Sequence, residues 1–135
     1  MPYPEVTMSS DTIHNPKEPR HLMRAKIVPR TVRVRRGGKV IAESSNALRV
    51  TELAKDMFDP VFYFPKEDVL APLSLIEGKT SYCPLKGDAS YFSIDDSGEA
   101  IAWAYEAAFD FAGVINGRIA FYPDQVAIEE IGTSS

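Results

Sequence analysis

The chain has 135 residues, of which 44% are hydrophobic, and a formal net charge of −4. One compact domain typically takes about 100–200 residues, so this length predicts a single core and excludes two complete catalytic domains. The single cysteine, Cys83, excludes an intrachain disulfide and every multi-cysteine metal site. His14 and His21 are the only imidazoles, and we expect both to be solvated, which argues against a histidine-based catalytic triad. We predict no metal site and no cofactor.

Charge is distributed unevenly along the chain. Residues 1–39 carry nine basic and three acidic side chains, a balance of +6, whereas the remaining residues have a balance of −10. The basic charges are spaced singly and lack interleaved aromatic residues, a pattern that argues against a nucleic-acid-binding surface. We expect the basic segment to lie against the acidic body of the chain or, in a homodimer, against a second copy of it.

Hydropathy gives no sign of a membrane segment. No apolar run approaches the roughly 20 residues of a membrane-spanning helix, and the polar N-terminus lacks the apolar core of a signal peptide. We therefore expect a cytoplasmic protein without membrane contact.

The N-terminal part of the sequence differs in composition from the remainder of the chain. Residues 1–28 contain four prolines and no sustained apolar period, which predicts an extended or partly ordered arm. We expect the packed domain to cover residues 29–132, followed by a tail at 133–135. At its start, alternating residues from Thr31 to Arg35 and extended residues from Val40 to Ser44 flank a Gly-Gly turn, and this pattern predicts a β-hairpin.

Short runs of strand length continue through the rest of the chain. Turn-forming residues separate them, and none shows the apolar spacing of a long helix. The runs cover residues 47–51, 61–64, 81–83, 90–94, 101–105, 118–122 and 126–129. Residues 52–57 and 65–70 are the two places where a helical turn is an alternative. The succession predicts a mainly β domain, an antiparallel sandwich or a barrel-like fold with short helical turns.

Strand alternation assigns the large aromatic side chains to a face. In the run 101–105, Ile101, Trp103 and Tyr105 fall on one side, and Ala102 and Ala104 fall on the other. We expect the side with the large residues to face the core.

The most unusual local sequence is Cys83-Pro84-Leu85-Lys86-Gly87. A turn that brings Lys86 back over Cys83 would stabilise the thiolate, which is the nucleophilic form of cysteine. Lys86 could instead hold a phosphate or carboxylate group, assisted by backbone N–H groups near Gly87. The structural alternative is that Pro84 and Gly87 form a turn while Cys83 packs as a small hydrophobic residue.

A second group of polar residues lies within or beside apolar strands. Tyr63 stands in an apolar run that is followed closely by Asp68, and Arg49 and Glu52 lie near the end of the preceding strand. A phenol, two carboxylates and a guanidinium could converge there. The alternative is again structural, because tyrosine commonly buries its ring with the hydroxyl at the rim, and acidic residues commonly cap turns.

In combination these motifs resemble a family of small bacterial and fungal domains, domain of unknown function 427, which is labelled nucleotidyltransferase-like. The resemblance covers roughly residues 31–123. It is carried by the hairpin from Val32 to Ser44, the run from Leu48 to Glu52, Tyr63-Phe64-Pro65 with Asp68-Val69, Cys83-Pro84-x-Lys86-Gly87 with Ala89 and Tyr91, Ala102-Trp103-x-Tyr105, and Ile119-Ala120-Phe121-Tyr122. The likeness implies a compact, mainly β fold of the β-tent type. The sequence itself has neither a P-loop nor a Gly-Ser motif with paired aspartates, so an enzymatic role stays open.

These observations lead to two functional hypotheses. The first is a domain that binds a small anionic molecule, as an enzyme or as a simple binding protein, in which Lys86 is an exposed anion-binding cation, Asp68 or Glu52 accepts a proton, and Cys83 is a supporting thiol. The ligand contacts in this hypothesis are Tyr63, Tyr91, Arg49, Trp103 and Tyr105. The alternative is a non-catalytic interaction module or homodimer, in which the same residues form a buried polar network.

Overall fold

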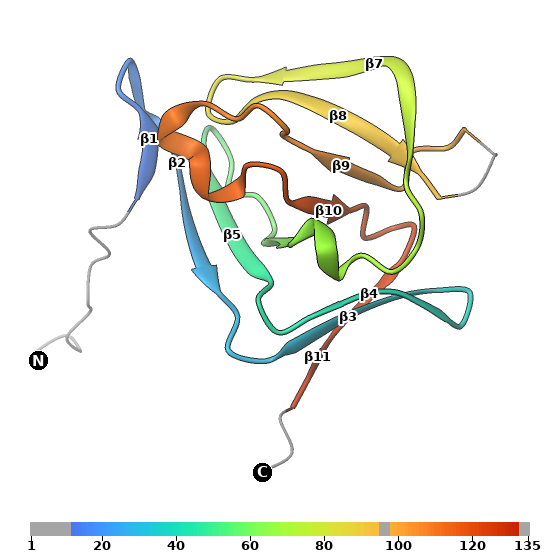
Figure 1. Ribbon diagram of the computed structural model, residues 1–135. Coiled ribbons are helices and arrows are strands. Elements are labelled where there is room, and N and C mark those ends of the chain that lie inside the picture. The colour runs from blue at the N-terminus through green and yellow to red at the C-terminus, as the bar shows by residue number, and fades with distance from the viewer. Residues whose placement is uncertain (1–11, 95–97, 133–135) are drawn as a thin grey trace, which may run out of the picture.

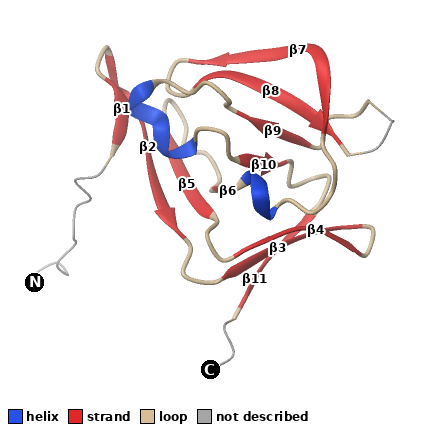
Figure 2. Ribbon diagram, in the orientation of Figure 1, coloured by secondary structure: helices blue, strands red, loops and turns tan. Residues whose placement is uncertain are grey.

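The computed structural model describes residues 12–94 and 98–132. These residues form eleven strands in two antiparallel sheets, together with two short 3-10 helices (Figure 2). The mainly β sandwich predicted from the sequence is confirmed, and the described strands do not close into a barrel. No helix in this part of the chain is long and apolar enough to cross a bilayer.

The larger sheet has eight strands in the order β1-β2-β5-β6-β10-β9-β8-β7, and the smaller has three in the order β11-β3-β4 (Figure 1). The elements in chain order are β1 (Ile13–Asn15), β2 (Glu18–Ile27), β3 (Thr31–Arg36), β4 (Lys39–Ser44), β5 (Leu48–Leu53), β6 (Val61–Phe64), the 3-10 helix η1 (Lys66–Asp68), β7 (Ser74–Cys83), β8 (Gly87–Ser93), β9 (Ala102–Ala104), the 3-10 helix η2 (Asp110–Ile115), β10 (Ile119–Phe121) and β11 (Ala127–Ile131).

The predicted hairpin forms from β3 and β4. Its two loop residues, Gly37 and Gly38, have φ angles of 58° and 83°. A two-residue hairpin loop with positive φ at both positions matches the right-handed twist of the flanking strands, and glycine adopts this conformation without a steric penalty. The Gly-Gly pair therefore sets the register of the hairpin next to the turn, where Arg36 pairs with Lys39, and an irregularity between Val34 and Arg35 shifts the register beyond it.

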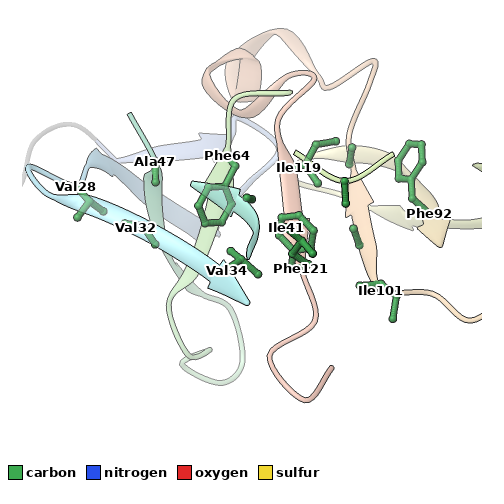
Figure 3. Close-up of a cluster of buried hydrophobic side chains, with 14 residues drawn as sticks. Val28, Val32, Val34, Ile41, Ala47, Phe64, Phe92, Ile101, Ile119 and Phe121 are labelled. Atoms are coloured by element: carbon green, nitrogen blue, oxygen red, sulfur yellow. The ribbon is translucent and has the colours of Figure 1, made fainter. Parts of the chain in front are cut away.

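The larger sheet carries a hydrophobic core on each face, although most side chains of β2 and β7 are exposed. The first core lies between the two sheets and includes Val34 of β3, Phe64 of β6 and Phe121 of β10 (Figure 3). The second core lies on the opposite face of the larger sheet, where Tyr63 and Ala120 point away from Phe64 and Phe121. Its buried members are Met23, Leu48, Val50, Tyr63, Leu85, Ala89, Tyr105, Ala112, Ile115 and Ala120.

The predicted faces of β9 need one correction. Ile101 packs in the first core together with Ala102 and Ala104, whereas Trp103 is half-buried on the side of the second core. β9 has a core on each of its faces, since its alanines pack in the first core and Trp103 packs against the second. The small alanines occupy the face between the two sheets, and the large indole lies on the other face. Tyr105 is buried, as predicted.

Residues 12–28 of the predicted arm contain strands β1 and β2. β2 pairs with β5 from Leu22 to Ile27, and Met23 is fully buried, so the packed domain begins well before residue 29. The sequence signal is weak because most side chains of β2 are exposed and Met23 alone is fully buried within the strand. Residues 1–11 of the predicted arm and the tail 133–135 lie outside the described residues.

Basic and acidic side chains pair across the smaller sheet. Arg33 of β3 bonds to Glu43 of β4, and Arg35 lies 2.8 Å from Glu129 of β11. β3 is the central strand of this sheet, so its arginines meet a glutamate on each of the two neighbouring strands. Part of the charge asymmetry seen in the sequence is therefore balanced within one chain.

Candidate functional site

A group of polar side chains lies beside the second core. Glu52 is bonded on both carboxylate oxygens, because His21 Nε2 lies 2.7 Å from Oε2 and Lys86 Nζ donates to Oε1. The side chains of Lys86, Glu52 and His21 are 8%, 15% and 17% exposed. Cys83 completes the group, since one donor atom from each of His21, Glu52 and Cys83 lies within 4.8 Å of the others. We call these four residues the Glu52 cluster.

Strand pairing explains how His21 and Glu52 meet. Met23 of β2 lies directly across from Glu52 of β5, and His21 is two positions earlier on the same face of β2. A diagonal cross-strand neighbour is within reach of a long side chain, so the imidazole contacts the carboxylate. Glu52 shares its face with Leu48 and Val50, which pack in the second core.

The tight turn between β7 and β8 supplies the other two members. The Lys86 N–H donates to the Cys83 carbonyl at 3.2 Å, which closes the turn that the sequence predicts. Leu85 is fully buried and anchors the turn on the second core. Lys86 is also buried, at 7% exposure, which corrects the expectation of an exposed cation.

Gly87 is required at the end of this turn. Its φ is +114°, a value that residues with a side chain rarely adopt, and a Cβ atom there would lie 3.3 Å from the Ala107 carbonyl oxygen. The Phe109 N–H donates to the Lys86 carbonyl at 3.1 Å, so the segment before η2 lies directly against the turn. The missing side chain of Gly87 thus permits the close packing that holds Lys86 in place.

The charges around Glu52 keep its carboxylate ionised. Burial acts to raise the pKa of Glu52, but the hydrogen bonds and positive charge supplied by Lys86 and His21 outweigh it, and the pKa is lowered. The Lys86 ammonium and the Glu52 carboxylate neutralise each other at a position partly shielded from water, where an unpaired charge would cost folding free energy.

Two tyrosines form the core side of the site. Tyr63 is 2% exposed and Tyr105 is 8% exposed, and Lys86 Nζ lies 5.6 Å from the centroid of the Tyr105 ring. Burial raises the pKa of both phenols, and the charges of Glu52 and Cys83 add to the effect. The two phenols therefore remain neutral hydrogen-bonding groups over the whole physiological pH range.

The solvent side of the site opens at His21. A pocket of about 480 Å³ is lined by His21 together with Glu18, Arg20, Ala54 and Lys55. Because His21 belongs both to this pocket and to the Glu52 cluster, a molecule in the pocket can reach the imidazole.

A family model described as "Domain of unknown function (DUF427)" matches residues 24–132. This chain belongs to the DUF427 family. The match confirms the resemblance found in the sequence and includes Glu52, Cys83 and Lys86, whereas His21 lies just before its first residue. No curated protein matches the chain. The description of DUF427 names no activity, so the function must be inferred from the site.

Two predicted site residues of this DUF427 domain lie elsewhere. Asp68 is in η1, where its Oδ2 accepts a hydrogen bond of 2.5 Å from Ser44 Oγ. Arg49 is on the face of β5 opposite Glu52, and its Nη1 lies 3.3 Å from Glu130 Oε1. The odd and even residues of β5 point to opposite sides of the sheet, which separates Arg49 from Glu52. The structure thus does not bring Asp68 or Arg49 to the cluster.

The remaining aromatic residues predicted for the site lie farther along the same face of the DUF427 sheet. Trp103 packs edge-on against Tyr63, with ring centroids 6.5 Å apart, and lies 4.7 Å from Tyr122. Tyr91 stacks on Tyr122 and shares a 2.6 Å hydrogen bond with Ser81. Trp103 therefore contacts the site through the Tyr63 ring. Tyr91 is linked to Trp103 in turn through the Tyr122 ring.

His21 is the site residue that sequence reasoning missed. The expectation that it is solvated is wrong, because its imidazole is largely buried and bonded to Glu52. Histidine chemistry is consequently open to this DUF427 domain through His21. His21 precedes the buried Met23 by two positions, which places both side chains on the same face of a strand. This signal becomes informative only once residues 18–27 are recognised as a strand.

Proposed function

We propose that this DUF427 domain binds a small anionic molecule in the pocket beside His21. The observation that carries the proposal is the composition of the pocket lining. The lining includes the basic side chains Arg20 and Lys55 together with His21. Among the described residues that line it, one is acidic, Glu18. Positive groups around a concave site attract an anion and raise its local concentration.

The proposal changes the part assigned to Lys86. Its ammonium is bonded to Glu52, and breaking a buried ion pair to release the cation is costly. Arg20 and Lys55 are better placed to hold the charged group of the ligand, because they line the opening directly. Arg20 also pairs with Glu18 at 3.4 Å, but this pair is exposed to solvent and costs little to break. Lys86 holds the Glu52 carboxylate behind the pocket. The proton-accepting role of Glu52 and the supporting role of the Cys83 thiol remain proposals.

Calorimetric titration of the full-length protein tests this function. Inorganic phosphate, nucleotides, sugar phosphates and dicarboxylates are titrated separately, at low salt, into protein from which metal and chelator have both been removed. We expect at least one class to bind, and we expect Arg20→Gln and Lys55→Gln each to weaken its affinity about tenfold, the loss of about 1.4 kcal/mol that one charge-assisted contact represents. Lys39→Gln, an exposed lysine in the smaller sheet, is the matched control and should leave the affinity unchanged.

Two results contradict the proposal. The first is that no anion class binds the wild-type protein. The second is that the affinity responds equally to Lys39→Gln and Lys55→Gln, because such binding would depend on net charge and not on the pocket. Raised salt should weaken true pocket binding as well, since it screens exposed charges.

A second candidate function is favoured by strand β7. It is an edge strand of the larger sheet, and its exposed side chains include Leu75 at 56% and Tyr82 at 65%. An exposed edge with apolar residues is a template for pairing with another chain. The corresponding proposal is an interaction module that forms a homodimer through β7.

Sedimentation velocity over a range of protein concentrations tests this alternative. Tyr82→Lys should shift a dimer towards monomer, whereas Val114→Lys, at an exposed apolar residue of η2, should not. Monomeric wild-type protein at all concentrations would reject the homodimer.

A further inference from the structure

We propose that His21, Glu52 and Cys83 form a binding site for a divalent transition-metal ion, and that the chemistry of the donors selects zinc. No two of the three donor atoms are more than 4.8 Å apart. They come from β2, β5 and the end of β7, so three separate segments of the chain bring them to one place.

The donor set decides the class of ion. Zinc binds thiolate sulfur, imidazole nitrogen and carboxylate oxygen, whereas magnesium and calcium prefer oxygen ligands alone. A thiolate, an imidazole and a carboxylate together therefore favour zinc or its spectroscopic substitute cobalt. Structural zinc sites usually have four protein ligands, and reactive ones have three with an open position. The three residues fit the second arrangement.

The distances require only small side-chain movements. Zinc lies about 2.3 Å from sulfur and about 2.0–2.1 Å from nitrogen, so tetrahedral geometry places ligand atoms about 3.3–3.6 Å apart. The 2.7 Å separation of His21 Nε2 and Glu52 Oε2 must open by less than 1 Å, and no other pair of donor atoms, all within 4.8 Å of one another, need close by more than about 1.5 Å. The ion takes the place of the direct hydrogen bond between these two side chains.

The surroundings of the three ligands suit a bound ion. Lys86 donates to the second oxygen of Glu52, and ligating carboxylates are commonly held by such an outer hydrogen bond. The thiolate and the carboxylate balance the charge of the ion, and Lys86 leaves an excess of one positive charge. That excess favours an anionic group or hydroxide at the open position. His21 lines the pocket, which gives the ion and its fourth ligand a route from solvent.

Titration of the full-length, chelator-treated protein with Co²⁺ tests the proposal. We expect one equivalent to bind and to produce a thiolate-to-cobalt charge-transfer band, and we expect Zn²⁺ to displace it. Cys83→Ser should abolish the band. His21→Gln should weaken the affinity by about 100-fold or more, because outer-shell changes alone cost about 10–100-fold at metal sites. His14→Gln is the matched control, since His14 lies on the opposite face of the β1–β2 pair, and it should bind like the wild type.

A second measurement uses the wild-type protein, so it remains informative if Cys83→Ser does not fold. Zn²⁺ should slow the alkylation of Cys83 in the wild-type protein, and it should give no such protection in His21→Gln. Thermal unfolding with and without Zn²⁺ adds a further readout, because an ion that binds only the native state must raise its melting temperature.

Three results overturn the metal site. They are a wild-type protein that takes up no equivalent of Co²⁺, a complex without the thiolate band, and equal affinities for His21→Gln and His14→Gln. The metal titration contains no added organic or phosphate anion, whereas the anion titration uses metal-free protein. Failure of one proposal is thus distinguishable from failure of the other.

Discussion

Lys86 donates to Glu52 in an ion pair whose two side chains are only 8% and 15% exposed. The lysine comes from the β7–β8 turn and the glutamate from β5, which are not adjacent in the sheet. The pair thereby ties the turn to the face that carries the second core.

Removal of one partner from this pair should strongly destabilise the fold. We expect Lys86→Met to lower the free energy of unfolding by about 3 kcal/mol, the lower end of the range for leaving a buried charge unpaired, because His21 remains on Glu52. Urea unfolding measures this change. The control is Arg35→Met, which removes an exposed pair with Glu129 and should cost less than about 1 kcal/mol. Equal small losses in both variants would contradict a structural role for Lys86.

Gly87 and Gly78 form a natural comparison. Both have positive φ, at 114° and 79°, but a Cβ at Gly78 meets nothing within 4 Å. We expect Gly78→Ala to cost about 1–2 kcal/mol, the penalty for a side chain in left-handed backbone. Gly87→Ala should cost at least about 1 kcal/mol more, because the Ala107 carbonyl must also move. Chemical denaturation of the two variants gives the difference, and a smaller loss at Gly87 would show that this close contact is unimportant.

Truncating one aromatic residue on each face of the larger sheet should show how much each face contributes to stability. Phe64 is fully buried between the sheets, so Phe64→Ala should cost about 3–5 kcal/mol. Trp103 is only half-buried, and we expect Trp103→Ala to cost less, about 1–3 kcal/mol, although its side chain is larger. Thermal or urea unfolding ranks the two variants. A greater loss of unfolding free energy for Trp103→Ala than for Phe64→Ala would instead support the sequence-based expectation that Trp103 faces the main core.

Tyr122 should contribute to alkaline unfolding. Burial, together with its neighbour Tyr91, raises the pKa of Tyr122 to about 12, and Trp103 and Asp124 also face it. The folded state thus holds the phenolic proton more tightly than the unfolded state does. The resulting stability is fully present below pH 10 and is lost as the pH rises from about 10 to 12. Because the phenol is only partly buried, the slope should be well below the limit of about 1.4 kcal/mol per pH unit.

The matched variant for this prediction is Tyr122→Phe. Its free energy of unfolding, measured from pH 8 to 11.5, should fall less steeply than that of the wild type above pH 10. Parallel curves for the two proteins would mean that Tyr122 titrates alike in the folded and unfolded states.

The features that sequence reasoning found are those encoded by short-range chemistry. The Gly37-Gly38 pair demands a tight hairpin, and the spacing of Cys83 and Lys86 demands a closed turn. Tyr63 could be linked to these residues only through the family resemblance, because strand alternation places it on a face without saying which distant residues share that face.

The features that sequence reasoning missed depend on long-range pairing. His21 lies in a strand whose side chains are mostly exposed, so its burial follows from the partner strand β5 and not from its own pattern. Asp68 follows Tyr63 closely in the chain, yet η1 carries it to Ser44 of β4. In β9, alternation separated the alanines from Trp103, but polarity could not show that the alanines are the more deeply buried residues, because both faces are apolar.

The β1–β2 hairpin makes a contact that matters for how this domain is delimited. The Asn15 side-chain amide donates to the Pro84 carbonyl at 3.1 Å, which joins the hairpin to the turn that carries Cys83 and Lys86. Asn15 and His21 both precede residue 24, where the family match begins. A protein shortened to that boundary would lack the imidazole, the buried Met23 and this clasp, and would leave one flank of Glu52 open to water. Ligand screens on such a shortened protein would therefore test a site that lacks His21.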